Sequence, residues 1–130
     1  MFAAHGKYTL DLTGEVIIVQ FYDTWNKECS IQFLNDYTKY VLGKCPGRFG
    51  VLADLTTLKG ATPESVSYFH KISEWGQQNG QIARAQLIDT EFKLFTIQTL
   101  QKGNDHYPIA SFTDKISALV WLKEQELKIE

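Results

Sequence analysis

The amino-terminal part of the chain changes from an alternating to a continuous apolar pattern. Every second residue from Tyr8 to Leu12 is apolar, Thr13 and Gly14 interrupt the pattern, and the run 16–21 is almost wholly apolar. Alternation with a period of two is typical of a half-exposed strand, and a short continuous apolar run is typical of a buried one. These residues therefore predict a β-hairpin whose second strand is buried.

Apolar residues at helical spacing mark four later segments, namely 26–42, 62–79, 91–101 and a last one that starts at Thr113 or Asp114. One broad side of the first segment carries Ile31, Phe33, Leu34, Tyr37, Tyr40, Val41 and Leu42. The second segment has the stripe Val66, Phe69, Ile72 and Gly76, and the last has Ile116, Leu119, Val120 and Leu127. Each pattern predicts a helix that buries one face. Gly43 supplies the expected C-cap of the first helix, and Gly80 ends the second.

Three further apolar segments, 49–55, 82–88 and 107–112, predict strands between these helices. The element order is then β-β-α-β-α-β-α-β-α. Strands that alternate with helices favour a mostly parallel sheet, with the first strand as an antiparallel edge. The sequence thus predicts an α/β fold with a five-stranded, mostly parallel mixed sheet flanked by four helices. Residues 1–130 form one expected domain, because no linker or repeat divides them.

The charge composition and the spacing of the cysteines limit the classes of partner and the cellular compartment that we expect. The chain has 13 Lys and Arg residues and 15 Asp and Glu residues, which gives a net charge of -2. The opposite charges are interleaved, so we expect neither nucleic acid nor an anionic membrane as the main partner, and no transmembrane segment is predicted. Cys29 and Cys45 lie outside any metal or redox spacing, and we expect reduced thiols in a cytoplasmic protein. Cys45 lies in a predicted turn, where exposure would permit oxidation.

Four sequence features together resemble the STAS superfamily, and most closely its SpoIIAA-like branch of anti-sigma-factor antagonists. They are the hairpin ending in Val16-Ile17-Ile18-Val19, the strand Gly50-Val51-Leu52-Ala53-Asp54-Leu55, the strand Gly80-x-x-x-Arg84-Ala85-x-Leu87-Ile88, and the ending Phe112-x-Asp114-x-x-x-Ala118-Leu119-x-Trp121-Leu122. The resemblance covers nearly the whole chain and rests on the order and spacing of the features. It implies a SpoIIAA-like fold and a regulatory protein as partner.

The phosphorylation motif of that superfamily is missing. In phospho-regulated members the Asp-Leu strand end is followed by Asp-Ser-x-Gly at the start of the next helix, and counted from Asp54 the Ser position falls on Pro63. Proline has no hydroxyl group to phosphorylate. Thr62 is a good N-cap, Pro63 suits the first helical position, and Glu64 favours the positive end of the helix dipole. We therefore interpret this stretch as a fixed helix start.

No combination of residues predicts catalysis, a metal site or a cofactor site. His5, His70 and His106 fall on three different segments without a neighbouring ligand at metal spacing. Asp23, Asp54 and Asp89 lie near the carboxyl ends of strands, where their side chains could converge as an acid-base site would need. Strand-end Asp residues more often bond to turn backbone or cap helices, which is the interpretation we favour. We expect a protein that is not an enzyme.

A surplus of apolar residues points to binding instead. In the segment 92–100, apolar side chains surround the predicted third helix, whereas a helix on a sheet buries only one side. The surplus is either covered by the last helix or left for a partner. Trp25, predicted in the loop after the second strand, either anchors a partner or plugs the end of the sheet. The candidate partner or ligand surface consists of Trp25, Thr62, Ser65, Phe92 and Phe95.

Three hypotheses remain open at this point. The first is a non-catalytic module that binds a regulatory protein. The second is binding of an apolar small molecule or lipid, or association with a membrane surface, through a lid-like third helix. The third is a homodimer formed through the same helix.

Overall fold

The computed structural model describes residues 6–45, 47–90 and 107–130. In chain order its elements are β1 (Lys7–Thr13), β2 (Val16–Trp25), α1 (Lys27–Lys44), β3 (Phe49–Asp54), β4 (Leu58–Ala61), α2 (Pro63–Gln78), β5 (Gln81–Leu87), β6 (Ile109–Phe112) and α4 (Lys115–Glu124). The helix that the sequence predicts over 91–101 lies outside the described residues.

The strands form one sheet in the order β1-β2-β3-β5-β6, with β4 attached to the end of β2. Only β1 runs antiparallel, because it is the first arm of the hairpin with β2; the β2-β3, β3-β5 and β5-β6 pairs are parallel. The mostly parallel sheet with an antiparallel first strand is confirmed.

The short strand β4 was missing from the sequence prediction, which treated 56–61 as loop. It pairs with β2 beyond a register shift between Asp23 and Thr24, where Asp23 adopts a left-handed φ of 63°. This bulge turns the end of β2 away from β3 and towards β4. Four residues that include Gly60 carry too little alternation to identify a strand from sequence.

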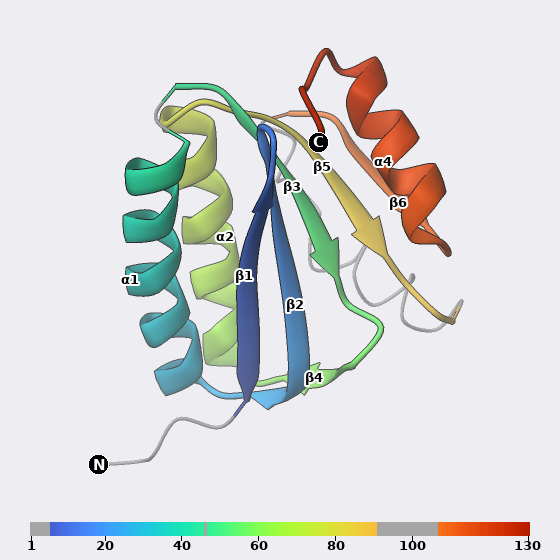
Figure 1. The fold of residues 1–130 in the computed structure, drawn as a ribbon. Coiled ribbons are helices and arrows are strands. Elements are labelled where there is room, and N and C mark those ends of the chain that lie inside the picture. Colours follow the sequence, from blue (N-terminus) through green and yellow to red (C-terminus); the bar gives the residue numbers. More distant parts are fainter. Residues whose placement is uncertain (1–5, 46, 91–106) are drawn as a thin grey trace.

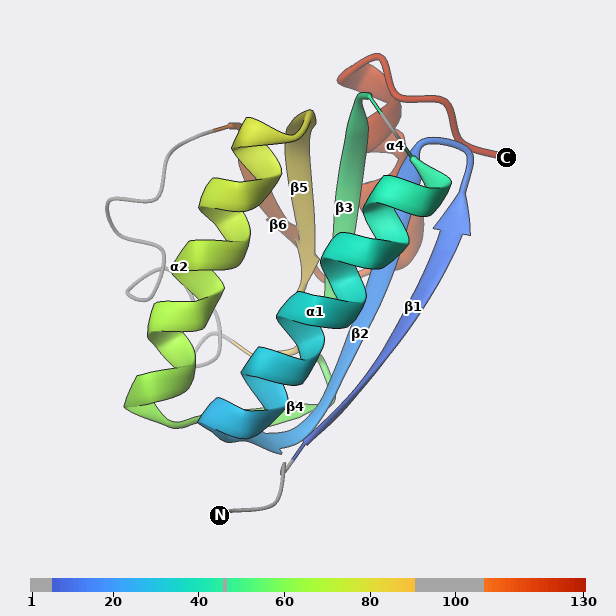
Figure 2. The same ribbon diagram turned by 90° about the vertical axis from the view of Figure 1, so that its left-hand side faces the viewer.

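Helices cover both faces of the sheet (Figure 1). In Figure 2, α1 and α2 lie side by side in front of the sheet, and α4 lies behind it. Each face therefore has its own apolar core: a larger one beneath α1 and α2, centred on residues such as Trp25, Phe33 and Tyr37, and a smaller one beneath α4. No helix in the described part of the chain is both long and apolar enough to cross a bilayer.

The boundaries of α1 match the prediction at its start but not at its end. The Asn26 side chain accepts a hydrogen bond from the Cys29 N–H, as an N-cap does. Gly43 is not the C-cap, because the helix continues to Lys44 and the Cys45 N–H bonds to the Val41 carbonyl at 2.8 Å. Leu42 is 58% exposed, so it lies outside the buried face on which the sequence placed it.

The buried face of α4 also differs from the prediction. Asp114 is the N-cap, as expected, but Ile116 and Val120 are exposed, while Ala118 and Leu122 are fully buried. The small Ala118 side chain lets the helix approach the alanines of β5, so the contact line runs through positions 118 and 122. Leu127 is buried, as predicted, although it follows the end of the helix.

Candidate functional site

The carboxyl ends of the parallel strands and the amino ends of α1 and α2 lie at the lower end of the molecule in Figure 1. Trp25, the last residue of β2, is fully buried there. Its indole N–H is 3.0 Å from the Tyr22 carbonyl oxygen, and its ring contacts four other aromatic rings, those of Tyr8, Phe21, Phe33 and Phe69. Of the two interpretations of Trp25, the structure agrees with a plug for the end of the sheet and leaves no exposed side chain for a partner.

The start of α2 at Thr62 is built as the sequence predicts. The Thr62 hydroxyl oxygen accepts a hydrogen bond from the Ser65 N–H, and Pro63 occupies the first turn. Ser65 is fully buried, and its hydroxyl donates to the Trp25 carbonyl oxygen at 3.3 Å. The fixed helix start is confirmed, and Ser65 offers no hydroxyl group at the surface.

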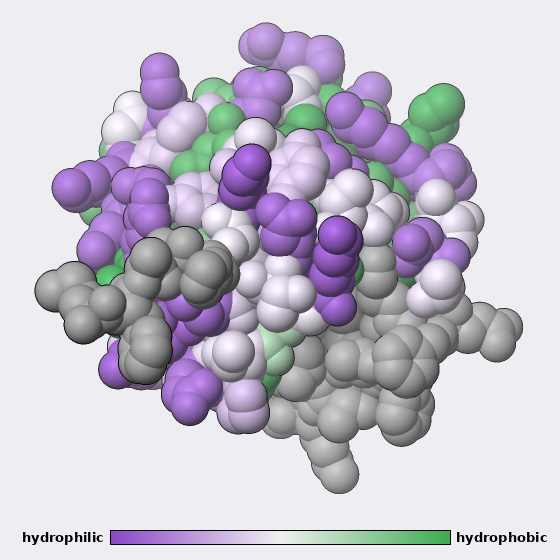
Figure 3. Space-filling view, turned by 90° about the horizontal axis from the view of Figure 1, so that it is seen from below, coloured by the Kyte–Doolittle hydropathy of each residue, from purple (hydrophilic) through white to green (hydrophobic). Residues whose placement is uncertain are grey.

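Little of the predicted surface remains at this end of the molecule. Thr62 is partly exposed, whereas Phe92 and Phe95 lie outside the described residues. Figure 3 shows this end, where the described surface is mostly hydrophilic or near neutral in hydropathy and green areas are small.

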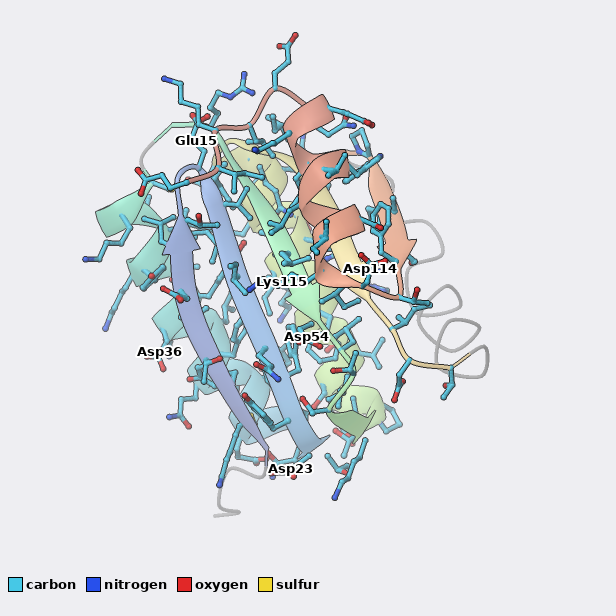
Figure 4. All side chains as sticks on the ribbon, turned by 45° about the vertical axis from the view of Figure 1, so that its right-hand side comes forward. Glu15, Asp23, Asp36, Asp54, Asp114 and Lys115 are labelled. Atoms are coloured by element: carbon cyan, nitrogen blue, oxygen red, sulfur yellow. The ribbon has the colours of Figure 1, made fainter. Side chains whose placement is uncertain are left out.

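The acidic residues do not form a catalytic group. The Asp54 carboxylate accepts hydrogen bonds from the Thr56 backbone N–H at 3.0 Å and from the Thr56 hydroxyl at 2.6 Å, so it holds the turn after β3. Figure 4 shows Asp23 and Asp54 apart, at the ends of different strands, and Asp89 is exposed. His70 is exposed on α2, while His5 and His106 are outside the described residues. Among the residues that the structure describes, no cluster of His, Cys, Asp or Glu could hold a metal ion.

Both cysteines are buried free thiols. Burial raises the pKa of Cys29 to about 11, and it also raises the pKa of Cys45, with Glu15 adding to the effect. The expected exposure of Cys45 is wrong, because this residue ends α1 with its side chain turned inward, only 8% exposed.

An apolar cavity lies between the helical layer of α1 and α2 and the sheet. Its volume is about 110 Å³. The apolar wall includes Phe33 and Tyr37 from α1, Phe69 and Ile72 from α2, and Val51 and Ala53 from β3. The buried residues of α2 are small, namely Ser65, Ser73 and Gly76, whereas its large side chains Phe69 and Ile72 are only partly buried.

The lining that β5 contributes to this cavity is polar. Gln81, Arg84 and Gln86 of β5 line it, together with Tyr107. The Tyr107 hydroxyl is 2.8 Å from the Ser73 hydroxyl, and the Arg84 guanidinium lies 5.8 Å from the centre of the Tyr107 ring. Sequence analysis did not select these residues, although polar side chains at 81, 84 and 86 within an otherwise apolar strand were a usable signal.

The Tyr37 phenol in the cavity wall is not prepared for proton transfer near neutral pH. Burial raises the pKa of the Tyr37 phenol far above its ordinary value; Tyr107 adds to this shift and the positive charge of Arg84 opposes it. The phenol therefore stays protonated, and Tyr37 contributes an apolar ring and a neutral hydroxyl group. Such a cavity can hold a ligand by burial and hydrogen bonding.

Comparison with known proteins gives structural likeness only. No family model and no curated protein sequence matches the chain. An uncharacterised protein of the DUF3478 family with a SpoIIAA-like fold, from Shewanella loihica PV-4, superposes with a TM-score of 0.71 at 14% identity, over 94% of this chain and 97% of that one.

Two further structures have the same fold. Unphosphorylated SpoIIAA, an anti-sigma factor antagonist, gives a TM-score of 0.62 at 11% identity, over 90% of this chain and 98% of that one. A predicted anti-sigma factor antagonist from Thermotoga maritima gives 0.55 at 16% identity, over 92% and 94%. The expected SpoIIAA-like fold is confirmed.

Proposed function

We propose that this protein is a non-catalytic binding module that holds a small apolar molecule between the sheet and the helices α1 and α2. The cavity of about 110 Å³ among aromatic and aliphatic side chains carries the proposal. Protein interiors are normally packed with few voids larger than a water molecule, so a space of this size calls for an explanation. An engineered apolar cavity of about 150 Å³ stays dry and takes up benzene.

The walls of the cavity support binding of an apolar ligand. Phe33, Phe69 and Ile72 come from two helices that pack beside each other, and Val51 and Ala53 come from the central strand β3. A ligand that leaves water for this space gains about 25 cal/mol for each Å² of apolar surface it buries. The walls belong to regular elements, so little ordering cost accompanies binding.

A variant that fills the cavity tests this function. Ala53→Leu extends a side chain from β3 into the space. We expect hexan-1-ol to shift the methyl NMR signals of Val51 and Ile72 in the original protein and to bind Ala53→Leu roughly tenfold more weakly, because the larger side chain occupies its place. Val120→Leu, which enlarges an exposed side chain of α4, is the matched control. Equal titration of all three proteins, or no shift at the cavity walls, would contradict the proposal.

A second candidate function is binding of a regulatory protein, favoured by the fold that the chain shares with two proteins described as anti-sigma factor antagonists. The partly exposed Thr62 at the start of α2 would belong to the contact surface. Thr62→Asp keeps an N-cap and adds a charge, so it should weaken capture of such a partner without unfolding the helix. If a captured partner binds Thr62→Asp as tightly as the original protein, it does not use the proposed surface.

A further inference from the structure

The two arginines of the chain have opposite surroundings. Arg48 forms an ion pair with Glu15 and donates to the backbone carbonyl of Glu126, and it is not among the described residues that line the cavity. Arg84 lies on the central part of β5 and lines the cavity. Its Nε is buried without a hydrogen-bond partner, and no carboxylate within the described residues pairs with it.

A buried Nε–H group without a hydrogen-bond partner carries an energetic cost. Arg84 is the one charged residue among the described residues that line the cavity. The ring of Tyr107, 5.8 Å away, stabilises the positive charge in part but accepts no hydrogen bond from the buried Nε. A buried donor without a partner destabilises a fold, so such groups are rare and this one calls for an explanation.

We infer that the ligand is a monocarboxylate with a short apolar tail, and that Arg84 binds its carboxylate while the tail lies among the aromatic and aliphatic walls. This inference rests on the proposed function, because it assigns one end of the ligand in the same cavity. A guanidinium has a planar set of N–H donors that matches the two oxygens of a carboxylate. A single negative charge balances the single cation, whereas a phosphate dianion would leave one charge uncompensated.

The polar and apolar parts of the cavity are arranged for such an amphipathic molecule. Gln81 and Gln86 accompany Arg84 on β5, on the same side as Tyr107, while Phe33, Val51 and Ala53 line the remainder. The cavity volume of about 110 Å³ suits a tail of a few carbon atoms.

Calorimetric titration and methyl NMR with hexanoate and hexan-1-ol test the inference. The two compounds have the same chain length, but hexanoate has a carboxylate where hexan-1-ol has a hydroxyl group. We expect hexanoate to bind the original protein roughly tenfold to a hundredfold more tightly than hexan-1-ol, because a charge-assisted hydrogen bond is added. Arg84→Met keeps the apolar stem and should abolish this preference, whereas Arg48→Met should retain it. A parallel titration with dodecanoate shows whether the carboxylate belongs to a long fatty acid or to a short-chain acid.

The stability of the ligand-free Arg84→Met protein is an independent measurement. An arginine that waits for a ligand gives no net stabilisation without it, so urea unfolding should show an equal or higher midpoint for Arg84→Met. A clearly lower midpoint would assign Arg84 a structural role and overturn the inference. Equal binding of hexanoate and hexan-1-ol would overturn it and leave the proposed function intact. Failure of both compounds to bind would contradict the proposed function itself.

Discussion

The Ser73 and Tyr107 hydroxyl groups lie 2.8 Å apart in the interior and connect α2 to the segment that leads into β6. Both residues are buried, so neither hydroxyl has water as a ready alternative partner. The Tyr107 ring is also the nearest aromatic neighbour of the Arg84 guanidinium. The pair therefore holds the polar lining of the cavity in place.

Removal of both members of this pair should be less harmful than the two single removals added together. Ser73→Ala leaves the Tyr107 hydroxyl unpaired and should cost about 1 to 2 kcal/mol of unfolding free energy. Tyr107→Phe should cost about 1 kcal/mol, and the double variant should cost less than the sum of the two. Urea unfolding of the four proteins gives the coupling energy, and strictly additive losses would show that the hydrogen bond contributes nothing.

Gly80, between α2 and β5, should tolerate no side chain. Its φ is 102°, and a Cβ atom there would lie 1.6 Å from the Gly47 carbonyl oxygen. We expect Gly80→Ala to destabilise the protein by about 2 to 4 kcal/mol, since both the backbone conformation and the contact become strained. Gly43→Ala is the control, because the space around Gly43 is open and the residue lies in α1; it should stabilise the fold by about 0.5 to 1 kcal/mol. Similar effects of the two substitutions on thermal unfolding would contradict this account.

The burial pattern of α4 and its sequence pattern predict different residues as important for stability. Leu122→Ala should cost about 2 to 5 kcal/mol because it opens a cavity against the sheet. Ile116→Ala should change the unfolding free energy by no more than about 0.5 kcal/mol, because that side chain is 76% exposed. Chemical denaturation measures both, and a larger loss for Ile116→Ala would mean that this side chain is covered in solution.

Neither cysteine should react while the protein is folded near neutral pH. The pKa of Cys29 is raised from its ordinary value of 9.0 to about 11, so the thiol form is favoured in the folded state. A thiol-specific reagent at pH 8 should label both cysteines only after unfolding in urea. Rapid labelling of the folded protein at Cys45 would contradict its burial.

The raised pKa of Cys29 also determines the direction in which the stability of the fold changes with pH. A pKa that is higher in the folded than in the unfolded state adds stability that is fully present below about pH 9 and is lost as the pH rises through about 11. The urea midpoint should fall over this alkaline range, and Cys29→Ser should reduce the slope. A midpoint that is independent of pH in this range would contradict the raised pKa.

The comparison of pattern and structure shows where local information is sufficient. The hairpin of β1 and β2, the N-caps Asn26, Thr62 and Asp114, and Pro63 at the start of α2 follow from residues that act on their immediate neighbours. The mostly parallel arrangement of the sheet follows from the alternation of strands and helices. These features depend on short-range geometry, which a sequence displays directly.

Positions that depend on contact between distant segments were predicted less well. Trp25 looks like a residue at a rim, yet the aromatic side chains of Tyr8, Phe33 and Phe69 enclose it. Ile116 and Val120 look like core residues, yet α4 meets the sheet through Ala118 and Leu122. Packing selects the face that permits the closest approach, and hydrophobicity alone does not identify that face.

The sequence by itself determined the order of the described elements other than β4, the helix starts and the place of Pro63 in the first turn of α2. Only the tertiary structure placed Arg84 without a hydrogen-bond partner for its Nε beside a cavity whose apolar walls come from α1, α2 and β3. The physical reason is that helix starts depend on backbone groups a few residues apart. A cavity depends instead on the volume that side chains from several elements leave unfilled, and on charges that find no partner once those elements have packed.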